Sequence, residues 1–382
     1  MTIRDAVKPS FKAQSRPAVL LLGLTLLLVA FGLIMVASAS VVDSYKETEN
    51  AAEVFLRQAL YALSGLIFLV VLSNLKISTY RRFAPPALLA LLVIQLVTVF
   101  FGEERNGNRN WLDLGVTTIQ PAEFLKIGLI IGLGLQLAQL NQDPESDKQI
   151  WRMVLAVSGV ALALVVLVGR DLGTGVVMGF TLMGMFLFAG MKLSHWLGLG
   201  TAVALVAAAA IYTSPSRRIR FEAWLNPDAA DPAGVMWQFE KGTWALASGG
   251  FWGTGLGRSK LKWSWIPEVE NDFIFAVIGE ELGTLGAGAV ILLFLFLAMT
   301  LFHIARLQTN PFSRNIVAGV MVWISMQAFI NIGVVLGLFP VLGVPLPMIS
   351  AGGSSLISTM GAIGVVLAVE RDRISQQVRR KS

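Results

Sequence analysis

Residues 266–283 read Ile-Pro-Glu-Val-Glu-Asn-Asp-Phe-Ile-Phe-Ala-Val-Ile-Gly-Glu-Glu-Leu-Gly and lead into an apolar run that continues to Met299. This stretch holds five carboxylates: Glu268, Glu270, Asp272, Glu280 and Glu281. A charged side chain near the centre of a bilayer costs roughly 2.5–3.5 kcal/mol, so carboxylates beside a membrane span usually serve a function. The stretch therefore predicts a membrane-embedded enzyme or transporter that works at the boundary between lipid and water.

The composition of the chain supports this interpretation. Of its 382 residues, 55% are hydrophobic and 14% are charged, whereas soluble domains carry about 25% charged residues. The absence of cysteine excludes disulfides, thiolate metal sites and a cysteine nucleophile. With only two histidines, a histidine-based metal centre is not expected either. The net charge of +6 is distributed in a way that argues against nucleic acid as a partner.

Apolar runs long enough to cross ~30 Å of hydrocarbon predict an all-α polytopic membrane protein with ten transmembrane helices. The predicted spans are residues 17–40, 55–73, 82–101, 121–140, 151–169, 172–190, 193–213, 272–302, 313–338 and 350–369. An even number of spans places both termini on one side of the membrane. The tails and connections on that side carry most of the loop Lys and Arg, including Arg4, Lys8, Arg81, Arg82 and Arg379. By the positive-inside rule, both termini are expected in the cytoplasm.

The chain is expected to form a single integral membrane domain over residues 1–382, with cytoplasmic tails at 1–16 and 370–382. The first span is too long for a removable signal peptide. A large outer loop at 214–271 holds six of the ten tryptophans. Because tryptophan favours the headgroup region, we expect this loop to be ordered and to touch the membrane in part. The segment 143–148 is expected to be an ordinary solvated loop.

Asp272 is the candidate catalytic residue, since it stands at the start of the eighth predicted span. Partial burial would make it a usable proton acceptor, although a carboxylate there could also only stabilise a helix N-terminus. Along one helix, Asp272 and Glu280 would lie ~12 Å apart. That is wider than the ~6.5–9.5 Å of an inverting glycosidase, which disfavours a two-carboxylate hydrolase. One base suffices where the leaving group is a pyrophosphate whose charge is stabilised by cations.

Cations are available on the same side of the membrane. Lys126 lies inside the fourth span and is either functional or paired with Glu123, Glu280 or Glu281. Glu280 and Glu281 are expected to be members of buried ion pairs. The arginines that begin the large loop could clamp phosphates or contact anionic lipid; they are Arg217, Arg218 and Arg220. Arg109 belongs to the second outer loop. Arg170 and Asp171 lie between the fifth and sixth spans and could be only a local ion pair.

The last outer loop, residues 337–355, carries no charge and is rich in Pro and Gly. Irregular backbone at membrane depth is tolerated only where protein buries it or where it lines a cavity. Its freed amides, with Ser354 and Ser355, could therefore meet a polar headgroup. The alternative interpretation is a re-entrant turn that only shapes the bundle.

Together these motifs resemble the SEDS proteins (shape, elongation, division and sporulation), the family of FtsW, RodA and SpoVE. The resemblance runs from the first span to the last. It rests on QPAEFLK (120–126), RDLGTG (170–175), RFEAWLNP (220–227), ASGGFWGTGLG (247–257), PEVENDFIFAVIGEELG (267–283) and NIGVVLGLFPVLGVPLP (331–347). EVENDFIF and SAGGSS are more similar to the division branch of the family than to its elongation branch.

The resemblance implies a peptidoglycan glycosyltransferase of the bacterial cytoplasmic membrane, acting at the division septum. Such an enzyme polymerises lipid II, an undecaprenyl-pyrophosphate-linked disaccharide peptide, on the outer face. The family motif implies that Asp272 deprotonates the acceptor sugar hydroxyl, which attacks the anomeric carbon with inversion. The expected substrate-binding residues are Arg109, Lys126, Arg220, Glu280, Ser354 and Ser355.

The expected partners are a class B penicillin-binding protein transpeptidase and other division proteins. The sequence identifies no cofactor with certainty, and a requirement for a divalent cation, Mg²⁺ or Mn²⁺, stays open.

The chain departs from the family pattern in several places. Asn110 stands where Arg often precedes the loop Trp, and Ala122, Arg170 and Ala351 replace the usual Ser, Pro and Tyr. None of these positions is the expected base. The alternative functions are a lipid II flippase, a RodA-type elongation polymerase and a scaffold. A flippase should tolerate Asp272→Asn, whereas a polymerase that depends on this base should not.

Overall fold

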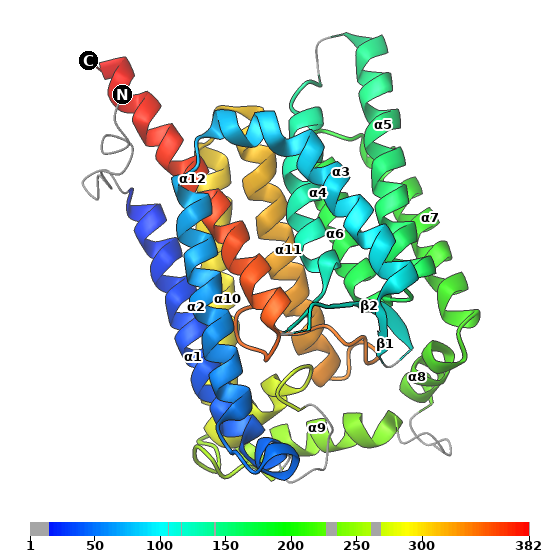
Figure 1. The fold of residues 1–382 in the computed structure, drawn as a ribbon, viewed down its shortest axis with the longest axis vertical. Helices are drawn as coiled ribbons and strands as arrows, with labels where there is room; N and C mark the ends of the chain where they lie inside the picture. The colour runs from blue at the N-terminus through cyan, green and yellow to red at the C-terminus, as the bar shows by residue number, and fades with distance from the viewer. Residues whose placement is uncertain are drawn as a thin grey trace.

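The computed structural model describes residues 15–105, 107–115, 117–140, 143–226, 235–260 and 269–381, which form a bundle of helices with one small sheet (Figure 1). The elements in chain order are α1 (Arg16–Thr48), α2 (Glu53–Asn74), α3 (Ile77–Phe101), β1 (Glu103–Arg105), β2 (Asn108–Asp113), β3 (Thr118–Ile119), α4 (Pro121–Leu137), α5 (Pro144–Leu162) with a π-helical continuation (Ala163–Val168), α6 (Leu172–Phe188), α7 (Leu193–Tyr212), α8 (Pro215–Leu225), α9 (Val235–Gly249), α10 (Ile274–Leu307), α11 (Pro311–Val335) and α12 (Gly353–Lys381).

Local sequence chemistry explains where several helices begin. Ser15, Asp143 and Asn310 precede α1, α5 and α11, and each side chain accepts a backbone N–H of the first turn. Each cap is followed by a proline early in the first turn, where its missing N–H costs nothing. Because Asp143 and Pro144 form such a start, the prediction of a solvated loop over 143–148 was wrong.

The predicted fold class is confirmed. Eight helices in the described part are long and apolar enough to cross a membrane: α1, α2, α3, α5 with its π-helical continuation, α7, α10, α11 and α12. The shorter apolar helix α6 occupies the sixth predicted span, and α4, with 17 residues, occupies the fourth. The number of ten spans stays a prediction.

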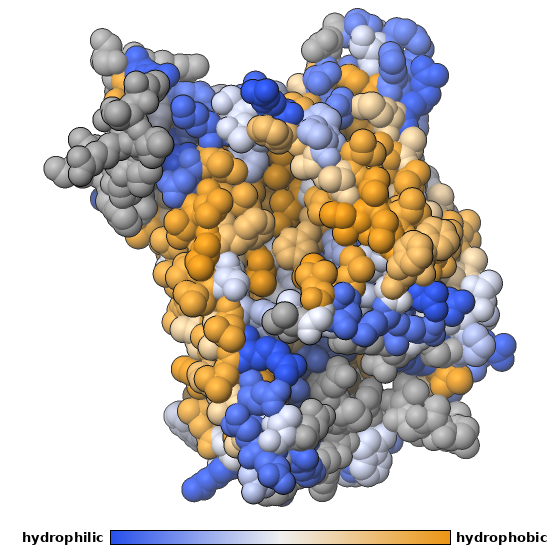
Figure 2. Space-filling view, in the orientation of Figure 1, coloured by the Kyte–Doolittle hydropathy of each residue, from blue (hydrophilic) through white to orange (hydrophobic). Residues whose placement is uncertain are grey.

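The outer surface of the bundle suits a lipid solvent. On the face shown in Figure 2, hydrophobic surface covers the middle of the molecule, and hydrophilic surface lies toward both ends. Outward-facing leucines and isoleucines of α1, among them Leu20, Leu27 and Ile34, are exposed. Only 6% of the most apolar part of α7 is buried by protein. Exposed apolar surface on this scale is stable where lipid covers it.

The two ends of the bundle differ. Ser15 Oγ donates to Glu370 Oε1 of α12 (2.5 Å), so the start of α1 lies beside the last helix. The sheet, α8 and α9 lie at the opposite end (Figure 1). This arrangement agrees with termini on one side and the large loop on the other. That the termini face the cytoplasm stays a prediction. The predicted tail 1–16 lies almost wholly outside the described residues.

The loops at this opposite end are more regular than the sequence suggested. The large loop contains α8 and α9, and its tryptophans 263 and 265 lie outside the described residues. β1 and β2 pair antiparallel, with Glu104 opposite Arg109 and Arg105 opposite Asn108. The intervening dipeptide at 106–107 is Asn-Gly, a strong hairpin signal. We had not predicted these strands.

The eighth predicted span, 272–302, needs a correction. α10 begins at Ile274, and it is interrupted at Gly283, which has φ 68° and ψ −170°. This conformation is almost exclusive to glycine. Asp272 therefore belongs to the turn before α10, and its distance from Glu280 cannot be derived from one continuous helix.

The packing of α2 against α12 depends on glycine, as is common between membrane helices. A Cβ atom on Gly364 would lie 2.5 Å from the carbonyl oxygen of Leu69. We expect Gly364→Ala to force the helices apart and to lower stability by about 1–3 kcal/mol. Gly159→Ala on α5 is the control, because no atom lies within 4 Å of its Cβ position. Thermal unfolding in detergent should show a lower midpoint for Gly364→Ala only.

Candidate functional site

Asp272 is held in place through its backbone. Its carbonyl oxygen accepts a hydrogen bond from Asn331 Nδ2 of α11 (3.0 Å). Ser350 Oγ donates to Asn271 O (2.5 Å), and the Ala351 amide donates to Glu270 O (2.9 Å). These donors come from α11 and the last outer loop, so the segment before α10 and that loop form one unit.

The Asp272 side chain is half-buried and faces the last outer loop. Its Oδ2 atom lies 3.6 Å from the position that a Cβ atom on Gly343 would occupy. Gly343 has φ +69°, a backbone conformation that other residues rarely adopt. The backbone conformation therefore favours glycine at position 343, and a Cβ atom there would come into van der Waals contact with the carboxylate.

The last outer loop is supported by two amide side chains of α11. Gln327 Nε2 donates to Pro345 O (3.0 Å), and Asn331 Nδ2 donates to Val344 O (2.7 Å). These bonds satisfy backbone carbonyls that no helix satisfies, as irregular backbone at membrane depth requires. Asn331 thus fixes Asp272 and the loop that faces it at the same time.

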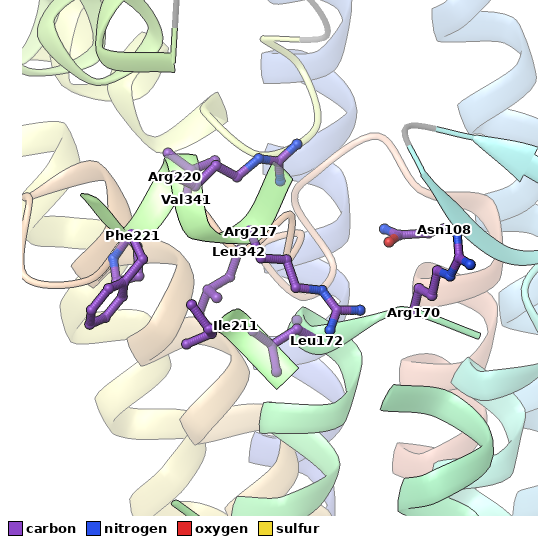
Figure 3. Close-up of a pocket in the computed structure, with 11 residues that line it drawn as sticks. Asn108, Arg170, Leu172, Ile211, Arg217, Arg220, Phe221, Val341 and Leu342 are labelled. Atoms are coloured by element: carbon purple, nitrogen blue, oxygen red, sulfur yellow. The ribbon is translucent and has the colours of Figure 1, made fainter. Parts of the chain in front are cut away.

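A pocket lined by arginines lies beside this unit. Arg170, Arg217, Arg220 and Asn108 are its polar lining, and residues 340–342 form one wall (Figure 3). Residue 343, the next in the chain, is the glycine that adjoins Asp272. In Figure 3, Arg217 and Arg220 approach from α8, and Arg170 and Asn108 lie across from them.

The electrostatics of this pocket favour an anion. Arg217 Nη1 donates to Ala210 O (3.1 Å). Burial lowers the pKa of Arg217, the Asp171 carboxylate opposes that shift, and the charges of Arg170 and Arg220 add to it. The guanidinium stays charged at any physiological pH. Within the described residues, the side chains of Arg170 and Arg220 form no hydrogen bond or ion pair. Such guanidinium groups suit a phosphate.

Arg170 is the residue that the sequence interpretation misjudged. It has φ +57°, which is uncommon outside glycine. Asp171 instead caps α6, accepting from Thr174 N (2.9 Å), and it accepts a second bond from Gln120 Nε2 (2.9 Å). The local ion pair of Arg170 with Asp171, which the sequence left open, is therefore not formed between these two described residues. The local sequence does not show that Arg170 lines the pocket, because the other arginines of the pocket, Arg217 and Arg220, belong to α8.

Arg109 lies outside the pocket lining. Its guanidinium forms an exposed pair with Glu104 Oε2 (3.3 Å) across the hairpin. Its neighbour Asn108 lines the pocket instead, and Asn110 is buried against Gln95 (3.2 Å). Contact of Arg109 with substrate stays a prediction.

Lys126 is fully buried and forms the ion pair with Glu123 that the sequence left as an alternative. Its Nζ lies 2.8 Å from Glu123 Oε1 and donates to Gln327 Oε1 (3.1 Å). It also stands 4.5 Å from the centre of the Trp323 ring. Through Gln327, the pair supports the last outer loop. Contact of Lys126 with substrate stays a prediction.

Ser354, Ser355 and Glu280 are also buried and bonded to protein groups. Ser354 Oγ accepts a hydrogen bond from the backbone N–H of Gln120 (3.0 Å). Ser355 Oγ accepts a hydrogen bond from Gln327 Nε2 (3.4 Å). Glu280 accepts from Ser259 Oγ (2.5 Å) and the Lys260 amide (2.9 Å). Their roles in substrate binding stay predictions. Among the residues that the structure describes, no three His, Asp or Glu side chains gather to hold a metal ion.

The fold and the site together define a multi-pass α-helical membrane protein with one half-buried carboxylate beside an anion pocket, at the end of the bundle away from the termini (Figure 1). The chain matches the cell cycle protein family FtsW/RodA/SpoVE over residues 18–375. It belongs to this family, as its motifs indicated.

Its relatives agree in sequence and in fold. The chain is 39% identical to the probable peptidoglycan glycosyltransferase FtsW of Mycobacterium tuberculosis, covering 92% of this chain and 67% of that protein. It is 36% identical to the stage V sporulation protein E of Bacillus subtilis, covering 94% and 98%. A structure from work on polymerization and crosslinking by a peptidoglycan synthase complex superimposes with a TM-score of 0.76 at 28% identity, covering 92% and 97%. The rod-shape-determining protein RodA of Thermus thermophilus superimposes with a TM-score of 0.67 at 26% identity, covering 92% and 96%.

The Glu123–Lys126 pair yields a stability prediction. Lys126→Met would leave the Glu123 carboxylate buried without its cation, which we expect to cost about 3–5 kcal/mol. Adding Glu123→Gln should recover much of the loss, because no uncompensated charge remains. Thermal unfolding in detergent measures both variants. A double variant no more stable than Lys126→Met would contradict this assignment.

Proposed function

We propose that this peptidoglycan glycosyltransferase polymerises lipid II at the end of the bundle that carries the sheet, α8 and α9, with Asp272 as general base. One observation carries the proposal. The half-buried Asp272, whose backbone is fixed by Asn331, lies next to the last outer loop, and residues 340–342 of this loop line a pocket that contains three arginines. Glycosyl transfer from a pyrophosphate needs a base for the acceptor and positive charge for the leaving group, and the site offers both.

In the proposed reaction, Asp272 takes the proton from the 4-hydroxyl of the acceptor GlcNAc. The oxygen attacks the anomeric carbon of the polyprenyl-pyrophosphate-linked strand from the opposite side of its leaving group. The bond from that carbon to the phosphate oxygen breaks, and the polyprenyl pyrophosphate leaves with the bonding electrons. Arg170, Arg217 and Arg220 stabilise the charge on its phosphates. No protonation of the leaving group is needed, so one carboxylate suffices.

The setting of the reaction is part of the proposal. The end of the bundle with the pocket faces outward, and both termini are cytoplasmic, as the loop charges predict. The partner is a class B penicillin-binding protein, which would crosslink the new strand. A superimposable structure comes from work on a complex that couples polymerization and crosslinking, which supports this pairing. Relatives named FtsW support a role with other division proteins at the septum.

The base is tested by polymerisation of lipid II. Purified protein with its transpeptidase partner should form glycan polymer when crosslinking is blocked. Asp272→Ala and Asp272→Asn should form none within detection, since neither side chain accepts the proton. Polymer lengths are read on denaturing gels, with Mg²⁺ or Mn²⁺ present and absent. Polymer from either variant at the wild-type rate would remove the mechanism and favour a transporter.

The arginine pocket is tested with a control on the same helix. Arg220→Gln and Arg170→Gln should each lower kcat/KM by about tenfold or more, because each loses a charge near the phosphates. Arg218→Gln is the matched control, since Arg218 forms an exposed pair with Glu222 (2.7 Å) and does not line the pocket. Its kcat/KM should stay within about twofold of wild type, as expected for an exposed pair. Equal losses in all three variants would contradict a specific anion site.

A further inference from the structure

The interruption of α10 at Gly283 divides it into two helices of different character. The first, residues 274–282, is short and follows Asp272 directly, and the second, residues 284–307, is the long membrane helix. A Cβ atom on Gly283 would lie 2.5 Å from the carbonyl oxygen of Phe251. The segment that approaches so closely belongs to the glycine turn 249–255, which follows α9. The glycine turn therefore packs directly against the backbone of α10 at Gly283.

This glycine turn provides hydrogen bonds to both helix ends at the break. The amides of Thr254 and Gly255 donate to Glu280 O (2.9 Å) and Glu281 O (3.0 Å), which are carbonyls at the end of the short helix. The amide of Thr284, at the start of the long helix, donates to Gly250 O (2.9 Å). Helix ends inside a protein need such partners. The turn therefore caps two helix ends at once.

Side chains make a second connection. Glu280 Oε2 accepts from Ser259 Oγ (2.5 Å), and Glu280 Oε1 accepts from the Lys260 amide (2.9 Å). Glu281 accepts from the Ser259 amide (3.2 Å) and from Ser38 Oγ of α1 (2.7 Å). Both carboxylates are buried. They fix the short helix to the segment after the turn and to α1.

We infer that the glycine turn 249–255, with Ser259, is a positioning element for Asp272. It fixes the orientation of the short helix 274–282, which the long membrane helix cannot fix because α10 is interrupted at Gly283. This inference rests on the proposed function of Asp272. Asn331, Ser350 and Ala351 hold the residues before the short helix, but a glycine break without further contacts would leave its other end less constrained. The turn and the two glutamates remove that freedom, and the base stays next to Gly343 and the arginine pocket.

The consequence for catalysis is geometric. The short helix of nine residues is about 13 Å long, so a small pivot at Gly283 moves its other end, where Asp272 stands, by an ångström or more. A displacement of ~1 Å of a reacting group can cost about 10²-fold in rate. Binding of lipid II at the arginines should not change, because no described residue of the turn is among those that line their pocket.

The test compares two glycines of α10. Gly283→Ala should lower kcat by about 10²-fold and leave KM for lipid II within about twofold. Gly288→Ala is the matched control, because no atom lies within 4 Å of its Cβ position, and it should leave kcat unchanged. Ser259→Ala introduces no clash and removes one hydrogen bond to Glu280, so it should lower kcat by about tenfold, again with KM unchanged. A rise in KM equal to the fall in kcat, or no change in Ser259→Ala and Gly283→Ala, would overturn the inference.

A second readout does not need activity. The chain has no cysteine, so Asp272→Cys gives a single reporter at the base position. Its rate of modification by a water-soluble thiol reagent should change severalfold when Gly283→Ala or Ser259→Ala is added. Adding Gly288→Ala should leave the rate unchanged. Equal rates in all backgrounds would refute the positioning role even if wild-type protein polymerises lipid II. Failure of wild-type polymerisation would instead refute the proposed function, and the labelling result would still report on the position of residue 272.

Discussion

Irregular backbone inside a membrane protein must find its hydrogen bonds in the protein itself, and the whole site depends on that constraint. Asn331 and Gln327 meet it for the last outer loop, donating to Val344 O and Pro345 O. Because Asn331 also donates to Asp272 O, the requirement to satisfy the loop fixes the candidate base as well. Gln327 in turn is held by Lys126 and by Trp323 Nε1 (2.7 Å). A buried polar network of this kind is rigid only while every member is bonded.

The buried pair of Lys126 and Glu123 supports the last outer loop through Gln327. Lys126 and Glu123 sit within α4, with less than a twentieth of each side chain exposed. The guanidinium groups that line the pocket lie instead near the surface at the end of the bundle. They belong to Arg217 and Arg220 of α8 and to Arg170. Charges that bind a phosphate must be accessible to it, whereas in a buried pair the low dielectric strengthens the attraction and also raises the desolvation cost, so each charge needs its partner.

Much of the architecture could be predicted from hydrophobic runs, because length and apolarity are properties of single segments. Asp272 and Arg220 could be singled out because each stands in a long local motif. Arg170 could not, since its role depends on a positive φ and on arginines more than forty positions away in α8. The break at Gly283 also escaped prediction. A single glycine in an apolar run does not reveal that the helical hydrogen bonds around it are replaced by bonds to the distant turn 249–255. The burial of Ser354 and Ser355 escaped prediction for the same reason, as their partners lie far away in the sequence, Gln120 just before α4 and Gln327 in α11.

The last helix has a consequence for handling the protein. α12 continues without interruption to Lys381, and its final turns stand clear of the bundle (Figure 1). The eleven residues after Glu370 would extend about 16 Å. A fluorescent protein or affinity handle fused there would sit on a stiff spacer, away from the end that carries the proposed site, and should leave assembly of the membrane domain undisturbed.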